Sequence, residues 1–410
     1  MLKIFILTTL LSLCSFLCIF PQSFKIPSIN FSPQKYICYY TNQQPNIDGK
    51  LEETIWEKVP WSDYFVDIRG DSFLIPTYNT RAKMLWDENY FYIAAELEEP
   101  DVWAAILKRD SIIFQDNAFE IFIDPDGDTH NYCELQLNAF NTIWDILLLK
   151  PYRDAKNAAN SEWNINDLKT AVSVDGTLND PSDKDRGWTI EIALPWKTFI
   201  DISTATVPPE DGDQWRINFA RVQWKLEVSG TEYQKKINPL TNKPYPEDYW
   251  VWSPQGIVNL HYPEMWGFVQ FSKNIAGINE NSFIVKEEES ARWLLRKIYY
   301  QQKKYFDENG KFTNDLNELS IQDLLVPGYK MPKIETTKYS FEVSIESDDR
   351  SKKIFIRDDG LIWQRQNSYE NRMDNRKRKN GALKKPNIRY EFGEKIVTAF
   401  KQISKPNAFN

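Results

Sequence analysis

The chain has 410 residues, of which 42% are hydrophobic and 14% aromatic, so its composition excludes a low-complexity or wholly disordered protein. The formal net charge of −8 argues against nucleic acid as the main partner. A chain of this length usually folds into two or three domains of about 100–200 residues each.

The N-terminal segment indicates export. Lys3 precedes an apolar run from Ile4 to Phe20, an order that is typical of a secretory signal peptide, which we place at residues 1–22. Lipidation and an uncleaved membrane anchor remain alternatives, because the apolar run is at the short limit for a membrane span. We therefore expect a protein that is secreted, periplasmic or held at the cell surface or envelope.

Two cysteines follow this segment, Cys38 and Cys133, and they could form a disulfide in an oxidising compartment. The two histidines, His130 and His261, do not lie at zinc-ligand spacing from them. Both histidines are expected to be solvated, because one lies in a polar turn and the other flanks a loop.

Residues 35–275 contain short runs in which apolar and polar side chains alternate. The runs lie at residues 81–86, 90–97, 118–124, 132–138, 187–196 and 215–220. Asp87, Glu88 and Asn89 separate the first two runs and indicate a hairpin. Alternation with a period of two predicts a mainly β fold, an antiparallel β-sandwich of the jelly-roll-like kind. The predicted core residues are Phe119, Ile121, Trp188, Ile190, Ile192, Trp215 and Ile217.

A smaller α+β module is predicted at residues 285–366. Acidic residues precede an apolar stripe of helical spacing, and basic residues follow it, as the helix dipole favours. The helix is expected to stop at Gly310, and strands are expected at 339–345 and 353–363 with a turn at Asp359 and Gly360. Residues 367–410 read as a basic, polar tail.

One side of several predicted strands is polar. Its members are Glu120, Glu134, Gln136, Asn138, Arg216 and Asn218. If these strands are neighbours, the side chains form a surface rich in hydrogen-bonding groups that suits a polar ligand. An ordinary solvated sheet face is the alternative. Asparagine is a poor strand former, which favours a compensating role for Asn138 and Asn218.

The turn DPDGDTH carries Asp124, Asp126 and Asp128 at alternate positions, with Gly127 permitting a tight bend. Hard oxygen ligands at such spacing can bind calcium. A solvated hairpin turn is the alternative, because Asp-Gly is favourable turn chemistry in itself.

Six segments follow one another in a recognisable order between residues 46 and 271. They are NIDGKLEETIW, MLWDENYFYIAAELEEPDVW, residues 113–141, GWTIEIALPW, WRINFARVQW and WSPQG with PEMWGFVQF. This series resembles the family 9 carbohydrate-binding modules and their DOMON-like relatives. The resemblance implies a non-catalytic β-sandwich that binds sugars, such as plant or cell-wall polysaccharides like xylan or cellulose, and often carries structural calcium.

The resemblance also implies two aromatic rings that clamp the end of a sugar chain. Their positions fall on Phe114 and near Leu260 and His261, so the two-tryptophan clamp is not evident. Either another aromatic residue substitutes or the ligand differs. The candidate substitutes are Tyr262, Trp250 and Trp144. The predicted carbohydrate contacts are Phe114, Glu120, Glu134, Gln136, Asn138, Arg216 and Asn218, and the predicted calcium ligands are Asp124, Asp126 and Asp128.

Three other functions are alternatives to sugar binding. Glycoside hydrolysis would need an acid and a base among Glu120, Glu134 and Glu191, but alternation provides only a shared face. No G-x-S-x-G motif is found. A haem-binding or redox-partner sandwich would draw its ligands from Met84, Met265, His130 and His261. A structural interaction protein without sugar binding is the third.

Overall fold

The computed structural model describes residues 24–279 and 281–366. The predictions of a signal peptide at 1–22 and of a basic tail at 367–410 therefore lie outside the described residues. The chain divides into two units, Met1–Arg365 and Gln366–Asn410, and all the described residues except Gln366 belong to the first. Within the described residues, no helix combines the length and apolarity that crossing a membrane requires.

Thirteen strands form one large sheet, in the order β8-β7-β6-β5-β11-β17-β1-β3-β4-β10-β9, with β16 paired to β11 and β2 paired to β16. The strands are β1 Lys35–Tyr40, β2 Val66–Asp67, β3 Thr80–Trp86, β4 Tyr90–Glu98, β5 Ala118–Asp124, β6 Tyr132–Asn138, β7 Ile143–Leu148, β8 Ala159–Asn160, β9 Lys169–Asp175, β10 Gly187–Pro195, β11 Gln214–Gln223, β16 Asp248–Val251 and β17 Gly267–Ile275. Short elements connect them: α1 Thr54–Glu57, α2 Lys197–Ile200, the 3₁₀ turns η1 Ile113–Gln115 and η2 Pro263–Met265, and the hairpins β12 Leu226–Ser229 with β13 Glu232–Lys235 and β14 Ile237–Asn238 with β15 Lys243–Pro244.

Strand β1 joins the two halves of the sheet. It runs parallel to β17 along most of its length and pairs in parallel with β3 through Tyr39 and Tyr40. Most pairs are antiparallel, as the alternating pattern predicts, and they include the predicted β3–β4 hairpin. Parallel pairing of β1 is possible because the connections that lead from it to β3 and to β17 are long enough to cross over. The sheet is therefore mixed.

The main core lies between the two halves of the sheet and makes the fold a sandwich. The apolar faces of β5, β6 and β11 meet those of β3, β4 and β10 in one buried cluster. For example, the ring of Trp196 contacts that of Trp215 edge to face, with centroids 5.7 Å apart. The predicted core residues are confirmed, because all belong to this cluster: Phe119, Ile121, Trp188, Ile190, Ile192, Trp215 and Ile217.

The outer face of β5 and β6 is also covered, which differs from the predicted solvated or ligand-facing surface. Every residue of β5 and of β6 is buried. A second apolar cluster on this side includes Phe122 and Tyr132 together with Val251 and Trp266, which come from much later in the chain. The polar side chains of this face are thus held among packed rings, and only a local opening admits a ligand.

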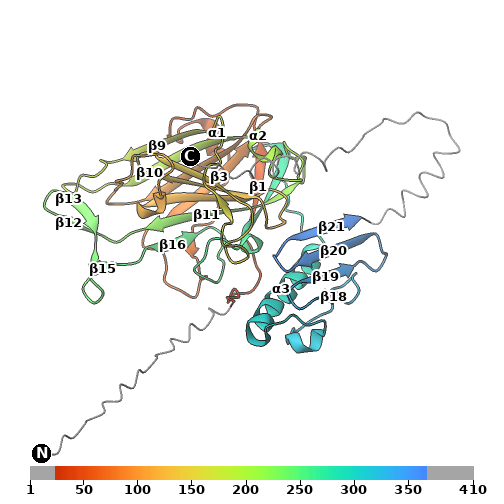
Figure 1. Ribbon diagram of the computed structural model, residues 1–410. Coiled ribbons are helices and arrows are strands. Elements are labelled where there is room, and N and C mark those ends of the chain that lie inside the picture. Colours follow the sequence, from red (N-terminus) through yellow and green to blue (C-terminus); the bar gives the residue numbers. More distant parts are fainter. Residues whose placement is uncertain (1–23, 280, 367–410) are drawn as a thin grey trace, which may run out of the picture. The chain divides into compact units, whose positions relative to one another are not determined.

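The C-terminal module has one helix, α3 Glu289–Asn309, beside a four-stranded sheet (Figure 1). The strands are β18 Lys333–Thr336, β19 Phe341–Glu346, β20 Lys352–Arg357 and β21 Ile362–Gln366, and the 3₁₀ turn η3 spans Leu316–Leu319. The helix and the two predicted strand regions are confirmed. Gly310 ends α3 in the left-handed region at φ 65°, which glycine adopts without steric cost.

The module and the sandwich share packed and polar contacts. Tyr262 and Met265 of the sandwich belong to the apolar cluster that α3 forms with β19 and β20. His130 is buried, and its Nε2 lies 3.0 Å from the carbonyl oxygen of Asp359 in the module. The prediction that His130 is solvated is therefore wrong, because the module covers the turn that carries it.

The two cysteines are both free and buried in the main core. Cys38 lies on β1 and Cys133 on β6, and burial raises the pKa of each thiol. The disulfide considered from the sequence is not formed.

Candidate functional site

A pocket of about 260 Å³ opens on the outer face of strands β5, β6 and β7. We call it the outer-face pocket. It is lined by Ile68, Phe114, Glu120, Glu134, Gln136, Trp144, Ile146, Tyr152, Tyr249, Val258, Asn259, Leu260 and His261. Four of the seven predicted carbohydrate contacts lie here: Phe114, Glu120, Glu134 and Gln136.

The strand register places the polar floor of the pocket. Glu120 of β5 lies opposite Gln136 of β6, which in turn lies opposite Trp144 of β7. Glu134 is two residues before Gln136 and therefore on the same face. The alternation that sends Phe119 and Ile121 into the core thus gathers carboxylates, an amide and an indole on the opposite side.

Hydrogen bonds fix this floor but leave two carboxylate oxygens without a partner. The Gln136 Oε1 atom accepts from the backbone N–H of Phe114 at 3.0 Å, and its Nε2 donates to Glu134 Oε1 at 2.5 Å. The Oε2 atoms of Glu120 and Glu134 make no hydrogen bond, although the two residues are only 1% and 4% exposed. A buried carboxylate oxygen without a donor is costly, so both atoms are ready to accept from a ligand.

The electrostatics of the pocket follow from burial. Burial raises the pKa of Glu120 well above its usual value, and the nearby Glu134 and Glu247 raise it further. Burial also raises the pKa of Glu134 to about 7. Burial and the charge of Arg153 lower the pKa of His261 to about 3, so this ring is neutral near pH 7. The His261 Nε2 atom, 3.8 Å from Glu134 Oε2, therefore does not neutralise that carboxylate.

Aromatic rings form the walls. Phe114, Trp144 and Tyr249 are partly exposed, and Tyr152 is 44% exposed. Tyr152 contacts the His261 ring edge to face at 4.6 Å. Partly exposed rings around hydrogen-bonding groups suit a ligand that has both C–H faces and hydroxyls.

The structure distinguishes among the predicted clamp positions. Phe114, Leu260 and His261 all line the outer-face pocket, and so does the candidate substitute Trp144. Tyr262 packs in the cluster of the C-terminal module and donates to the carbonyl of Lys25, and Trp250 lines a different cavity. The His261 side chain is only 16% exposed in the pocket wall, so the prediction that it is solvated is wrong.

The other three predicted contacts lie away from the pocket. Asn138 bonds Asp116 Oδ2 and the carbonyl of Ile106, which holds the loop that precedes η1. Asn218 exchanges two hydrogen bonds with the backbone of Ser253. In each case the asparagine side chain hydrogen-bonds its strand to a loop, which accounts for a poor strand former at this position.

Arg216 reaches toward the C-terminal module. Its guanidinium donates to the carbonyl of Trp266 at 3.0 Å and to Glu289 Oε2 of α3 at 3.1 Å. It also lies over the ring of Phe268, with its Cζ atom 3.5 Å from the centroid. The alternation of β11 puts Arg216 on the predicted polar face, but its side chain lies at the contact between the sandwich and the C-terminal module.

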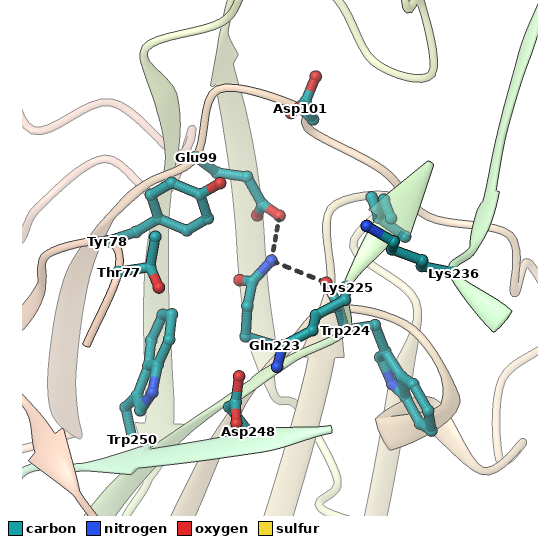
Figure 2. A pocket seen from close by; sticks show the side chains of 11 residues that line it. Thr77, Tyr78, Glu99, Asp101, Gln223, Trp224, Lys225, Lys236, Asp248 and Trp250 are labelled. Carbon is teal, nitrogen blue, oxygen red and sulfur yellow. Dashed lines mark hydrogen bonds between the residues drawn. The ribbon is translucent and has the colours of Figure 1, made fainter. Parts of the chain in front are cut away.

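A second cavity, of about 270 Å³, opens where β11 ends and β16 begins (Figure 2). Trp250 and Tyr78 stand on one side and Trp224 on the other, around the amide of Gln223. Gln223 Nε2 donates to Glu99 Oε1 at 3.1 Å, and Glu99 also accepts from Asn117 and Trp188. The polar groups at the centre of this second cavity are thus already hydrogen-bonded to one another. The outer-face pocket is therefore the stronger candidate for a ligand-binding site.

The acidic turn between β5 and β6 brings together the three predicted calcium ligands. Single carboxylate oxygens of Asp124, Asp126 and Asp128 lie within 4.8 Å of one another. Burial and mutual repulsion raise the pKa of Asp124 well above its usual value and that of Asp128 to about 7. Hard oxygen donors gathered in one turn fit a divalent cation such as calcium, and the charges of Arg292 and Arg296 also act on Asp128.

The residues considered for other chemistry are spread over the molecule. Glu191 accepts from Trp56 Nε1 and from the backbone of Asp48 and Gly49, and it lies on β10, which is not a neighbour of β5 or β6. The possible haem ligands occupy different places: Met84 in the main core, Met265 in the cluster of the module, His130 against the module and His261 in the outer-face pocket.

Sequence reasoning missed part of the pocket wall. Tyr249, Tyr152 and Asn259 come from segments without a clear alternating pattern. Tyr249 is placed because β16 pairs with β11, where it lies opposite Val222. The sequence around Tyr249 and Tyr152 has no pattern that predicts a place in the pocket wall. Their position follows only from the pairing of distant strands and the packing of loops.

The sandwich and its pocket, with rings around unpartnered polar groups, define a binding module. Residues 47–220 match the family model described as carbohydrate family 9 binding domain-like, which is less than half of the chain. This part of the chain is thus similar to the family 9 carbohydrate-binding domains, in agreement with the resemblance read from the sequence.

Known proteins show similar segments. A stretch of 80 residues is 32% identical to endo-1,4-beta-xylanase C of Paenibacillus barcinonensis, which is 20% of this chain but only 6% of the xylanase. Two solved structures of a family 9 module from Caldicellulosiruptor kristjanssonii are also similar. The one in complex with cellotriose is 16% identical with a TM-score of 0.39, and covers 61% of this chain and 99% of the module. The one in complex with glucose is 18% identical with a TM-score of 0.38, and covers 61% and 100%.

Proposed function

We propose that the protein binds carbohydrate non-catalytically in the outer-face pocket. The observation that carries the proposal is the convergence of Phe114, Trp144 and Tyr249 around two buried carboxylates whose Oε2 atoms accept no hydrogen bond. Sugar rings pack their C–H faces on aromatic side chains and donate hydroxyl hydrogens to such acceptors. The family description of residues 47–220 and the xylanase match support carbohydrate as the ligand class, with polysaccharides such as xylan as candidates.

A glycan array probed with the full chain tests this function. We expect binding to a subset of glycans, and no release of reducing ends when the bound glycans are incubated with the protein. An array without any bound glycan would contradict carbohydrate binding. Release of sugar would contradict the non-catalytic role and would direct attention to Glu120 and Glu134.

We further propose that the turn of Asp124, Asp126 and Asp128 binds calcium as a structural ion. The three carboxylates would hold the ion, which would supply only charge neutralisation and rigidity to the turn. Support comes from the close approach of their oxygens and from Gly127, which turns the backbone at φ 64°. Calcium is expected to raise the melting temperature, and Asp126→Asn is expected to reduce that rise. An identical melting temperature in calcium and in a chelator would contradict the site.

Finally, we infer that the protein is exported. The support is the apolar run from Ile4 to Phe20 after Lys3. Fractionation of cells that express the full chain should find the protein outside the cytoplasm, and Leu10→Arg, within the apolar run, should retain it inside. Cytoplasmic recovery of the unaltered chain would contradict export.

A further inference from the structure

The outer-face pocket holds acidic groups that its own lining does not neutralise. Among the described residues that line it, two are glutamates and none is lysine or arginine. Glu247 lies close enough to act on Glu120 as well. The neutral His261 adds no positive charge. The raised pKa values of both acids show that negative charge is unfavourable in this partly buried cavity, so a carboxylate-bearing ligand is disfavoured, whereas a cation stabilises the ionised form of the acids.

The cations around the pocket are already occupied. Arg153 donates to the carbonyl of His261, and its guanidinium also bonds Glu264 at 2.8 and 3.0 Å. Lys235, near Phe114 through Gln115, lies over the ring of Trp224 and donates to Gln115 Oε1. Neither of these cations lines the pocket, so its acidic character persists up to the position of a ligand.

The geometry of the two acids favours a donor that carries positive charge. The Oε2 atoms of Glu120 and Glu134 are buried, unpartnered and on one face of neighbouring strands. A hydroxyl donates one hydrogen, whereas an ammonium group donates three and forms charge-assisted bonds that are about twice as strong. The rings of Trp144, Tyr249 and Phe114 provide π faces at the same opening, which attract a cation further.

We propose that the outer-face pocket selects a sugar that carries a protonated amine, such as a 2-amino-2-deoxyhexose, over the corresponding neutral sugar, and rejects a uronic acid. The inference rests on the proposed function and names the ligand class of that same site. In the complex, Glu120 and Glu134 accept from the ammonium group while the ring of the sugar packs on the aromatic walls.

Calorimetric titration of the full chain tests the selectivity with four probes at a pH where the amine is protonated: D-glucosamine, N-acetyl-D-glucosamine, D-glucose and D-glucuronate. Glucosamine is expected to bind about tenfold or more tightly than glucose, since charge-assisted bonds replace neutral ones. N-acetylglucosamine has nearly the same shape without the charge and should lose this advantage. Glucuronate should bind most weakly.

Two variants with nearly unchanged shape connect the selectivity to the acids. Glu120→Gln and Glu134→Gln should each reduce the preference for glucosamine over glucose about tenfold, because a glutamine keeps a hydrogen-bonding side chain but cannot take up the negative charge that a bound ammonium group stabilises. Glu52→Gln, at an exposed position, is the matched control and should change nothing. Since the comparison of probes uses the unaltered protein, it stands even if a variant fails to fold.

The outcomes separate this inference from the function on which it rests. Glucose or glucuronate binding as tightly as glucosamine would overturn the amine preference and leave carbohydrate binding intact. Selectivity that persists in both glutamine variants would also overturn the assignment to these acids. The proposed function itself fails only if the glycan array shows no bound sugar.

Discussion

At the scale of single residues, the outer-face pocket depends on a few side chains that the packing leaves incompletely satisfied. Phe114 is held in place by its own backbone N–H, which donates to the Gln136 amide. Its ring is partly exposed beside Glu120 and Glu134. The residue therefore combines a fixed backbone with an available ring face, as a stacking residue requires.

Substituting Phe114→Ala is expected to weaken sugar binding about tenfold, because the loss of a stacking ring at a binding site costs about 1–2 kcal/mol. Affinity measured by calorimetry checks this. Phe73→Ala is the matched control, since Phe73 is exposed, packs on Arg69 and does not line the pocket. Equal affinities of the Phe114 variant and the unaltered protein would remove Phe114 from the site.

The buried Glu134 should make stability depend on pH. Its pKa is about 7 in the folded protein and near its ordinary value of about 4.3 when unfolded. A raised folded pKa means that the stability present below pH 4 is lost as pH rises through 7. Glu134→Gln should therefore raise the free energy of unfolding at pH 8 by about 1–3 kcal/mol and change it little at pH 4. Denaturant titrations at the two pH values provide the test, and an equal effect at both would contradict it.

At the scale of elements, the alternation of β5 and β6 determines both the core and the pocket floor. The core side could be predicted because each strand carries its own apolar period, as Ile121 and Leu135 show. The outer side could not be predicted in full, because Tyr249 and Trp266, which pack against it, lie more than a hundred residues after β5 in the chain. Glu120, Glu134 and Gln136 could be found by period alone, whereas Asn138, Asn218 and Arg216 share that period yet serve loops and the module.

Strand β10 belongs to the half of the sandwich that does not carry the pocket. Ile192 on this strand is fully buried in the main core. Ile192→Ala is expected to lower the free energy of unfolding by about 2–5 kcal/mol through the cavity that it leaves. Sugar affinity of the folded variant should stay unchanged. Denaturant unfolding and calorimetry together check this, and an altered affinity with unaltered stability would contradict the separation of core and site.

At the scale of the whole molecule, the C-terminal module supports the wall of the pocket through a chain of bonds. Tyr300 of α3 donates a hydrogen bond to Glu264 Oε1, and Glu264 also accepts a hydrogen bond from the Arg153 guanidinium. Arg153 also donates to the carbonyl of His261 at 3.1 Å and adjoins Tyr152 in sequence. Both His261 and Tyr152 line the pocket, so the module can influence binding without contacting the ligand.

Tyr300→Phe removes the first bond of this chain and keeps the ring. Sugar affinity is expected to fall about two- to tenfold, and the free energy of unfolding should fall by about 1–2 kcal/mol, because a hydrogen bond to a buried charge is lost. Tyr305→Phe on the same helix is the control, since its hydroxyl bonds the exposed side of Glu318. If the two variants bind sugar equally well, the module does not position the wall.

The insertion of β1 between β17 and β3 sets the smallest portion of the chain that can fold by itself. A recombinant piece cut to residues 47–220 would lack both β1 and β17, which together close the gap between β11 and β3. It would expose the unpaired backbone groups of two strand edges, and such edges tend to pair with other chains. Anyone who expresses this sandwich alone should begin no later than Lys35 and end no earlier than Ile275.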